Sequence, residues 1–192
     1  KKYLDNLSET TYSDPVKYYL AAQMELDKMV EELINELKEN NKLDDTVIAL
    51  VGDHYPYTLS TEQMNEVSSY EKDGTIEVNH SNFILWNNQM EEPVSVTKVG
   101  SQIDVLPTLL NLFGIEYDSR LIIGKDIMAS NNEGVVIFPD RSWINSKGAY
   151  DINSGMFVPF VDSIDDKYIS KINQEVYDKF KVSTNLQYTD YY

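Results

Sequence analysis

A long amphipathic helical pattern leads directly into a short run of apolar, β-branched residues, and this succession limits the folds open to the chain. Apolar side chains recur with a helical period from Tyr19 to Leu37, after the typical helix start Ser13-Asp14-Pro15. The pattern predicts a helix that ends near Asn40-Asn41. Residues 46–51 then read as a strand buried on both faces, as in the middle of a parallel sheet. A helix followed by such a strand is half of an α/β repeat.

The following segments predict more elements of the same kind. A short helix is expected at 61–69 and a second short buried strand at 83–86. A further apolar helix is expected at 103–113, with Pro107 in its first turn and Gly114 as its C-terminal cap.

The style of the sequence changes near residue 130. A linker-like stretch at 130–134 precedes short strand candidates separated by turn residues, which predict an antiparallel meander. These candidates are 135–138, 142–144, 149–152 and 155–158. From Ser163 on, spaced apolar residues predict a closing amphipathic helix through Ile172 to Phe180.

Composition excludes several functional classes. The chain has 192 residues and a formal net charge of −16, which argues against nucleic-acid binding and against unassisted docking on anionic lipid. Because it contains no cysteine, it has no disulfide framework, thiolate metal site or cysteine nucleophile. The longest apolar run, Val47 to Val51, is far shorter than a membrane span. Lys1-Lys2-Tyr3 offers neither an initiator Met nor a signal core, so we expect a piece of a longer protein.

The most informative polar pair follows the first predicted strand. Asp53 and His54 come directly after Gly52, at the carboxyl end of the strand, where open α/β sheets place their ligands. A carboxylate and an imidazole suit a divalent cation such as Mn, Zn or Mg, and glycine lets the backbone bend tightly before them. A hydrogen-bonded polar turn explains the same residues. Because a zinc site takes at least three protein ligands, further ligands would have to come from elsewhere.

Other polar candidates have simpler explanations. His80 precedes the second predicted strand and would enter from its amino end, away from Asp53, unless that strand runs antiparallel or the loop folds over. A surface loop histidine is the simpler explanation. Asp104 suits the N-terminal amides of its helix, and Thr108 suits the helix surface. The sequence contains no G-x-S-x-G, phosphate-cradling glycine loop or H-E-x-x-H motif.

Two motifs together carry a family resemblance. Gly52-Asp53-His54-Tyr55 after an apolar strand, followed about 50 residues later by residues 100–115 (GSQIDVLPTLLNLFGI), closely resembles the carboxyl-terminal half of sulfatase-like proteins of the alkaline phosphatase superfamily. More narrowly, the chain is similar to lipoteichoic acid synthases and related phosphoglycerol transferases of Gram-positive bacteria. The resemblance runs from about Asp14 to Ile152.

This resemblance implies a fold and a site. It implies an α/β fold: the carboxyl-terminal part of a helix-flanked, mostly parallel sheet in residues 1–130, and a small antiparallel sheet with a terminal helix in 131–192. It assigns Asp53 and His54 as ligands of a divalent metal, manganese first, with Mg, Ca or Zn as alternatives. The nucleophile, a threonine that forms a covalent phospho-intermediate, lies upstream of this chain, so no catalytic nucleophile is expected within it. His80 lies near a position where the family often has a basic residue, which leaves a substrate contact or a role at a second metal open.

The expected function is therefore the metal-binding half of a membrane-anchored phosphoglycerol transferase or sulfatase-like phosphodiesterase. Its expected partners are a phospholipid headgroup or another phosphate or sulfate ester, and the missing amino-terminal half of the same protein. We expect an extracellular catalytic domain at the cell membrane of a Gram-positive bacterium, and no activity from this piece alone. The alternatives are a non-catalytic cell-surface binding module on the same fold, or an α/β interaction domain in which Asp53-His54 is merely a turn.

Overall fold

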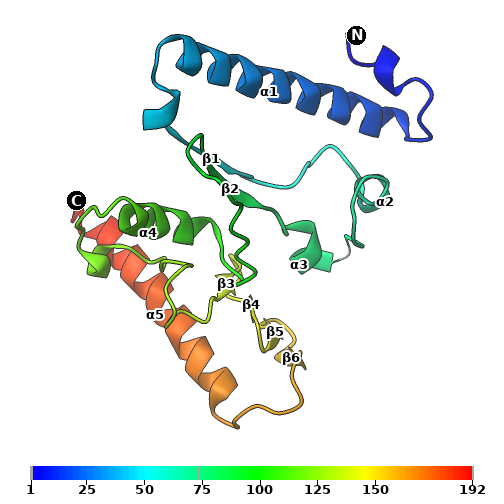
Figure 1. Cartoon of the computed structure of the whole chain (residues 1–192). Helices are drawn as coiled ribbons and strands as arrows, with labels where there is room; N and C mark the ends of the chain where they lie inside the picture. Colours follow the sequence, from blue (N-terminus) through cyan, green and yellow to red (C-terminus); the bar gives the residue numbers. More distant parts are fainter. Residues whose placement is uncertain (1, 73, 192) are drawn as a thin grey trace. The chain divides into compact units, whose positions relative to one another are not determined.

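The computed structural model describes residues 2–72 and 74–191. The chain divides into two compact units, Lys1–Pro93 and Val94–Tyr192, which we call the N-terminal and the C-terminal unit. The N-terminal unit contains α1 (Asp14–Glu39), β1 (Val47–Val51), α2 (Thr61–Asn65), α3 (Gly74–Val78) and β2 (Phe83–Asn87) (Figure 1). The C-terminal unit contains α4 (Gln102–Leu112), β3 (Val136–Ile137), β4 (Trp143–Asn145), β5 (Gly148–Asp151), β6 (Met156–Pro159) and α5 (Tyr168–Tyr188). Single 3-10 turns lie at Asp5–Leu7, Leu43–Asp45 and Ser119–Leu121. The functional domain boundary expected at residue 130 stays a prediction.

Helix α1 begins and ends where the sequence predicts, but not by the expected cap. Pro15 occupies the first turn, and the helix ends at Glu39, with Asn41 in the left-handed region at a φ of 55°. Ser13 makes no side-chain capping bond, and its hydroxyl is buried without a hydrogen-bond partner among the described residues. Its backbone N–H instead donates to the Glu66 carboxylate at 2.6 Å, so a distant segment anchors this helix end.

The first sheet differs from the parallel arrangement that the sequence suggested. Strands β1 and β2 pair antiparallel, with Val47 opposite Asn87 and Val51 opposite Phe83. Only Ile48 of β1 is buried, and Leu50 and Val51 are 42% and 48% exposed, so the prediction of a strand buried on both faces is wrong. An apolar run marks a strand that suits burial, whereas strand direction and actual burial depend on the neighbouring elements.

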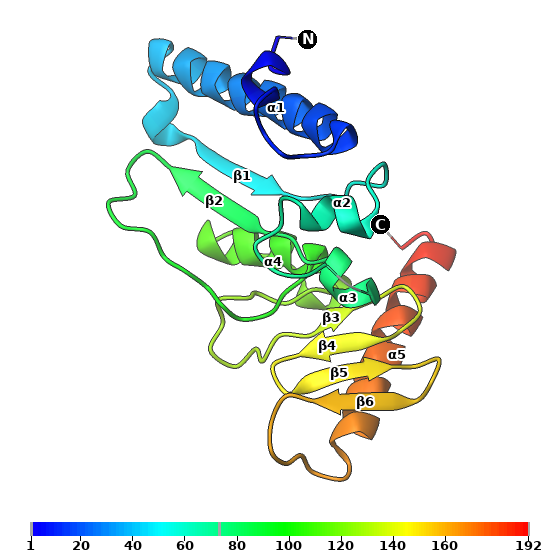
Figure 2. The same ribbon diagram turned by 90° about the vertical axis from the view of Figure 1, so that its right-hand side faces the viewer.

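The C-terminal unit confirms the predicted antiparallel meander and terminal helix. Its sheet has the order β3-β4-β5-β6 with every pair antiparallel, and α5 lies against it (Figure 2). Trp143 is fully buried and packs with Ile172 and Val176 of α5. The indole Nε1 donates to Asn173 Oδ1 at 2.7 Å, which satisfies the polar edge of the buried ring. The mixed α/β class expected from the sequence is confirmed.

Helix α4 corrects two details of the prediction. Pro107 lies inside the helix rather than in its first turn. Thr108 is buried, not on the helix surface, and its hydroxyl donates to Asp104 O at 2.6 Å and accepts from Ile127 N at 3.1 Å. Helical periodicity cannot show that a later segment, here the one at Ile127, covers this face. Gly114 ends the helix with a φ of 63°, as predicted.

Candidate functional site

Asp53 and His54 lie side by side just beyond the carboxyl end of β1. His54 Nε2 is 3.5 Å from Asp53 Oδ2, and the backbone N–H of His54 donates to Asp53 Oδ1 at 2.9 Å. The Asp53 side chain is 87% exposed and that of His54 is 45% exposed, so both reach solvent. A carboxylate oxygen and an imidazole nitrogen thus lie close together on two side chains that reach solvent.

The ring of His54 is held in a defined orientation by the residues that follow it. Its Nδ1 lies 2.7 Å from the carbonyl oxygen of Tyr55, and since a carbonyl only accepts, Nδ1 is the donor. The neutral ring therefore presents the lone pair of Nε2 on the side of Asp53. Tyr57 stacks on the imidazole with ring centroids 4.1 Å apart and an interplanar angle of 6°, and Tyr55 meets Tyr57 edge-on. These contacts fix the ring without using Nε2.

This donor set fits part of a divalent metal site. Metal–ligand distances of about 2.1 Å and a tetrahedral angle place two ligand atoms about 3.4 Å apart, close to the observed 3.5 Å. Histidines that bind metals usually donate their other ring N–H to a carbonyl or carboxylate oxygen, as His54 does to the carbonyl of Tyr55. Within residues 2–72 and 74–191, no group of three or more His, Asp or Glu side chains is arranged to hold a metal ion. The pair supplies two ligands and leaves room for others.

The loop before β2 reaches the same end of the strand pair. Because β2 runs antiparallel to β1, its first residue, Phe83, lies opposite Val51. The Ser81 hydroxyl lies against Gly52, where an added Cβ would be only 2.4 Å from Ser81 Oγ. The φ of Gly52 is not positive, so the close Ser81 hydroxyl, and not the backbone conformation, is what a side chain at this position would meet. His80, next to Ser81, is thus on the same edge as Asp53 and His54.

A small polar cluster surrounds His80, and sequence reasoning missed it. Lys72 Nζ donates to the His80 carbonyl oxygen at 2.8 Å and to the Tyr70 hydroxyl at 2.7 Å. The Tyr70 and His80 rings lie 4.9 Å apart, and His80 Nδ1 is 3.8 Å from Glu77 Oε2. Lys72 forms no ion pair with any carboxylate that the structure describes. The antiparallel pairing puts the loop that holds His80 at the same end of the strand pair as Asp53, and strand direction could not be predicted from the sequence.

Asp104 has a structural role in the C-terminal unit. Its buried carboxylate accepts the backbone N–H of Ser101 at 2.9 Å and that of Lys125 at 2.8 Å. This confirms the expectation that Asp104 satisfies amides at the start of α4. Its oxygens hold a later segment against the helix, which removes Asp104 from the candidate ligands.

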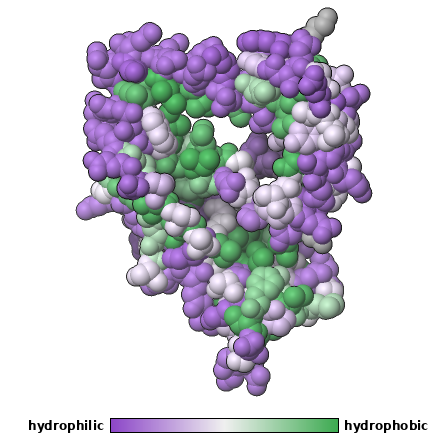
Figure 3. Space-filling view, turned by 45° about the vertical axis from the view of Figure 1, so that its right-hand side comes forward, coloured by the Kyte–Doolittle hydropathy of each residue, from purple (hydrophilic) through white to green (hydrophobic). Residues whose placement is uncertain are grey.

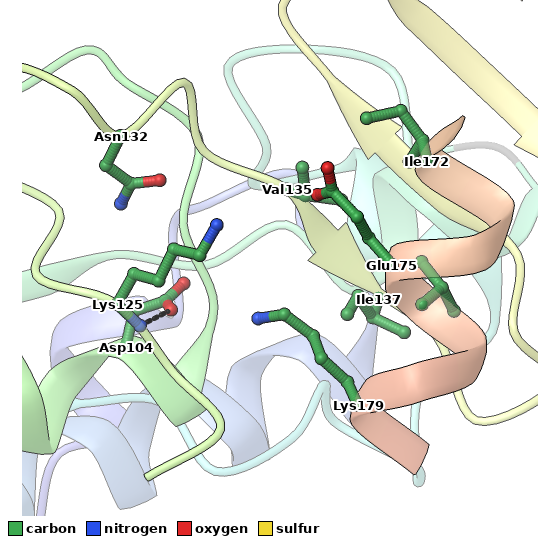
Figure 4. A pocket seen from close by; sticks show the side chains of 9 residues that line it. Asp104, Lys125, Asn132, Val135, Ile137, Ile172, Glu175 and Lys179 are labelled. Atoms are coloured by element: carbon green, nitrogen blue, oxygen red, sulfur yellow. Dashed lines mark hydrogen bonds between the residues drawn. The ribbon is translucent and has the colours of Figure 1, made fainter. Parts of the chain in front are cut away.

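A small polar cavity lies between α4, β3 and α5, within the C-terminal unit (Figure 4). Its volume of about 20 Å³ suits about one water molecule. The side chains of Lys125, Lys179 and Glu175 lie around it, and Lys179 Nζ donates to Ile123 O at 2.8 Å. Burial first, and then the charge of Lys125, lower the pKa of Lys179. The cavity is too small for a substrate. Its effect is on Lys179, whose pKa is lowered by burial and by the nearby charge of Lys125.

None of the helices in the described part of the chain is both long and apolar enough to cross a membrane.

A comparison with known protein families shows that residues 2–115 match the model of the family described as Sulfatase. The matched segment contains β1, β2 and the Asp53–His54 pair, together with α4.

Curated relatives and a solved structure agree on one type of enzyme. The lipoteichoic acid synthase of Staphylococcus saprophyticus is 30% identical over 143 residues, which is 73% of this chain and 22% of that protein. That of Staphylococcus aureus strain USA300 is 29% identical over 135 residues, 69% of this chain and 21% of that protein. The crystal structure of the lipoteichoic acid synthase LtaP from Listeria monocytogenes matches with a TM-score of 0.62 and 27% identity, over 86% of this chain and 43% of that one. The chain therefore spans about a fifth of the length of these curated relatives.

Proposed function

Because this chain belongs to the sulfatase family, we propose that it is the metal-binding part of a phosphoglycerol transferase of the lipoteichoic acid synthase type. The observation that carries the proposal is the pair of donor atoms Asp53 Oδ2 and His54 Nε2, 3.5 Å apart and open to solvent. The pair lies at the carboxyl end of a strand within the matched segment, where α/β folds gather their ligands.

Asp53 and His54 are the residues that would hold the cation. The family generally uses divalent metals, and we propose manganese, with Mg, Ca or Zn as alternatives. When bound, such an ion lowers the pKa of a nucleophile and neutralises charge that develops on a phosphoryl group. The chain's own contribution is to place one anionic and one neutral ligand, with the imidazole fixed by Tyr55 and Tyr57.

We infer that the remaining ligands and the nucleophile come from a part of the protein outside this sequence. The chain covers only 22% of one relative and 43% of the matched structure, and two ligands do not complete a site. The proposed nucleophile is a threonine that forms a covalent phospho-intermediate. Apolar residues are exposed on both strands, including Leu50 and Ile84. Their exposure supports the proposal that the amino-terminal half of the protein covers them.

The substrate would be a phospholipid headgroup or another phosphate or sulfate ester, and the enzyme would be membrane-anchored with an extracellular catalytic domain. We propose that His80 contacts this substrate, since its loop shares the strand end with Asp53. Lys72 adds a cation there, held by two neutral acceptors and with one ammonium N–H to spare. A positive group beside a metal pair suits an anionic ester.

Titration of the 192-residue chain with Mn²⁺, followed by paramagnetic broadening of backbone NMR signals, tests the metal site. We expect selective broadening around residues 52–57 and at the 79–82 loop. Asp53→Asn and His54→Gln should each weaken binding about tenfold or more, because each removes one of two ligands.

The matched control is Asp45→Asn, which removes the same charge from an exposed aspartate at the opposite end of β1. In a chain of net charge −16, this variant reports the non-specific attraction of a cation. Equal losses in Asp45→Asn and Asp53→Asn, or broadening spread over all acidic surfaces, would show that Asp53-His54 is only a turn.

A further inference from the structure

The hairpin between β3 and β4 places an arginine where such loops ordinarily need glycine. The loop is closed by Arg141 N donating to Phe138 O at 2.9 Å and by Phe138 N donating to Ser142 O at 2.8 Å. Arg141 has a φ of 75°, in the left-handed region that L-residues with a Cβ rarely adopt. Hairpin loops that end on a left-handed residue usually have glycine there. Backbone strain that persists at a non-glycine residue points to a use for its side chain.

The neighbouring carboxylate does not neutralise this arginine. Asp140 accepts the backbone N–H of Ser142 at 2.9 Å, the Ser142 hydroxyl at 2.9 Å and Asn153 Nδ2 at 2.9 Å. These bonds, led by the one from the Ser142 backbone, lower the pKa of Asp140 and keep its carboxylate turned into the loop. No carboxylate in residues 2–72 and 74–191 forms an ion pair with Arg141.

Aromatic rings of α5 hold the guanidinium instead. It lies 5.7 Å from the ring centroid of Tyr177 and 5.4 Å from that of Phe180. Cation–π contact positions the charge but leaves the N–H donors in the plane of the group available. The chain's other arginine, Arg120, is the contrast, since it forms a two-pronged pair with Asp118 and lowers the pKa of that carboxyl to about 2. Arg120 is therefore paired with a carboxylate, whereas the N–H donors of Arg141 remain available to a ligand.

Arg141 borders an open groove with a volume of about 370 Å³, within the usual size of a small-molecule site. The groove is lined by Arg141, Ile152, Ser170, Asn173, Gln174, Val176 and Tyr177. Its only formally charged lining residue is the arginine, and the rest combine amide and hydroxyl groups with apolar surface. Asn173 Oδ1 is occupied by the Trp143 indole, so its Nδ2 is the end left to donate.

We propose that this groove binds a phosphate ester of a small polyol, with the phosphate on the Arg141 guanidinium and the hydroxyls on the amide and hydroxyl side chains of α5. A guanidinium fork matches two phosphate oxygens, and amides beside an aromatic ring suit hydroxyl-bearing carbon chains. The preference for phosphate over carboxylate rests on the proposed function. The groove shares no residue with the Asp53–His54 pair and needs no metal.

The test is an NMR titration of the 192-residue chain with glycerol 1-phosphate in the absence of divalent metal. We expect shifts confined to the 138–142 loop and to residues 170–177, and binding in the millimolar range. Inorganic phosphate, glycerol and glycerate should each bind at least several-fold more weakly, because each lacks part of the ligand. Equal binding of inorganic phosphate or of glycerate would overturn the polyol phosphate assignment.

Arg141→Asn is the decisive variant, because asparagine tolerates the left-handed backbone and removes the charge. We expect glycerol 1-phosphate to bind about tenfold or more weakly, while the thermal midpoint stays at or above that of the parent chain. Arg120→Gln is the matched control and should leave binding unchanged. If Arg141 only clamps α5, the midpoint falls and binding is unaltered, which would overturn the proposal.

The same titration on Asp53→Asn separates this site from the proposed metal centre. Groove binding should persist in that variant, and Mn²⁺ broadening around residues 52–57 should persist in Arg141→Asn. Loss of groove binding on removing Asp53 would place the phosphate at the metal pair and overturn the groove. If Mn²⁺ does not bind but glycerol 1-phosphate does, the result counts against the proposed function and not against the ligand site in the groove.

Discussion

The two units each contain an antiparallel sheet and a long helix, yet they differ in how far the apolar residues of their strands are buried. In the C-terminal unit, Trp143 is fully buried and meets Ile172 and Val176 of α5. In the N-terminal unit, the buried cluster is small, formed by Val16, Leu59 and Met64, and it does not include the strands. Leu50 and Ile84, which pair across β1 and β2, are 42% and 53% exposed. Figure 3 shows hydrophobic side chains at the surface on one face of the molecule.

The difference shows that the apolar composition of a strand and its burial in the structure are separate properties. Strands of the C-terminal sheet are short and mixed in composition, yet their unit closes on its own helix. Strand β1 is apolar throughout but leaves most of its residues accessible. A strand that suits burial but is exposed fits the proposal that another part of the protein covers it. The candidate metal pair lies at the end of that strand, so the proposed neighbour would complete both the sheet and the site.

The largest effect on the free energy of unfolding should come from Trp143→Ala. The substitution leaves a cavity and an unpaired Asn173 amide, so we expect a loss of about 3–5 kcal/mol in the C-terminal unit. Amide hydrogen exchange, read unit by unit, measures it. Trp143→Phe should cost clearly less, because a ring is retained. An equal loss of amide protection in both units would contradict the description of two separately packed units.

Gly52→Ala should have the next largest effect, this time in the N-terminal unit. The new Cβ would lie 2.4 Å from Ser81 Oγ, so the Ser81 hydroxyl must turn away from its present position, at a cost of about 1 kcal/mol. Denaturant unfolding measures the loss. Adding Ser81→Ala removes the clashing oxygen and should restore most of the stability, since Ser81 Cβ is 3.4 Å away. A double variant as unstable as Gly52→Ala would show that the contact with Ser81 is not the cause.

A smaller effect should appear at alkaline pH through Lys179. Its pKa is lowered from 10.5, mainly by burial, so the unfolded chain binds more protons than the folded one between the lowered value and 10.5. Stability should therefore rise with pH across that window. Lys179→Met should remove the rise, which we expect to be below about 1 kcal/mol because the side chain is only half-buried. Lys181→Met, at an exposed lysine of the same helix, is the control, and an unchanged profile in Lys179→Met would refute the assignment.

The smallest effect on stability should come from the exposed strand faces. Leu50→Thr with Ile84→Thr should change the free energy of unfolding by less than about 0.5 kcal/mol, because neither side chain is buried. Self-association, measured by sedimentation, should nevertheless fall, since an apolar strand pair is removed from the surface. Ile48→Thr alters the one buried residue on β1 and should destabilise the unit. A large loss of stability in the Leu50 and Ile84 variant would mean that these faces are already covered.

Much of the fold could be predicted from local pattern. The ends of α1, the four short strands and the terminal helix follow from periodicity and turn residues. Helix α3 was missed, because Gly74–Val78 lies in a polar stretch too short for a periodic signal. Helix α5 continues beyond Phe180 to Tyr188, since its last turns carry a polar pattern that resembles a tail.

The candidate site was predicted in part. Adjacent residues such as Asp53 and His54 are brought together by the chain itself, so spacing was enough to suggest them. Lys72, Tyr70 and Arg141 were missed because their surroundings are set by segments 8 to 39 residues away in sequence. His80 depended on one unknown, the direction of β2, and the antiparallel pairing places it on the edge that holds Asp53.

The sequence by itself determined which segments are helices and strands and that a carboxylate and an imidazole leave β1 together, because these depend on neighbours along the chain. Only the tertiary structure decided the direction of β2, the closeness of Ser81 to Gly52 and the placement of Arg141 over the rings of α5. Those arrangements depend on contacts between residues far apart in sequence. A pattern of apolar and polar residues specifies that such contacts are made, but not which partner makes them.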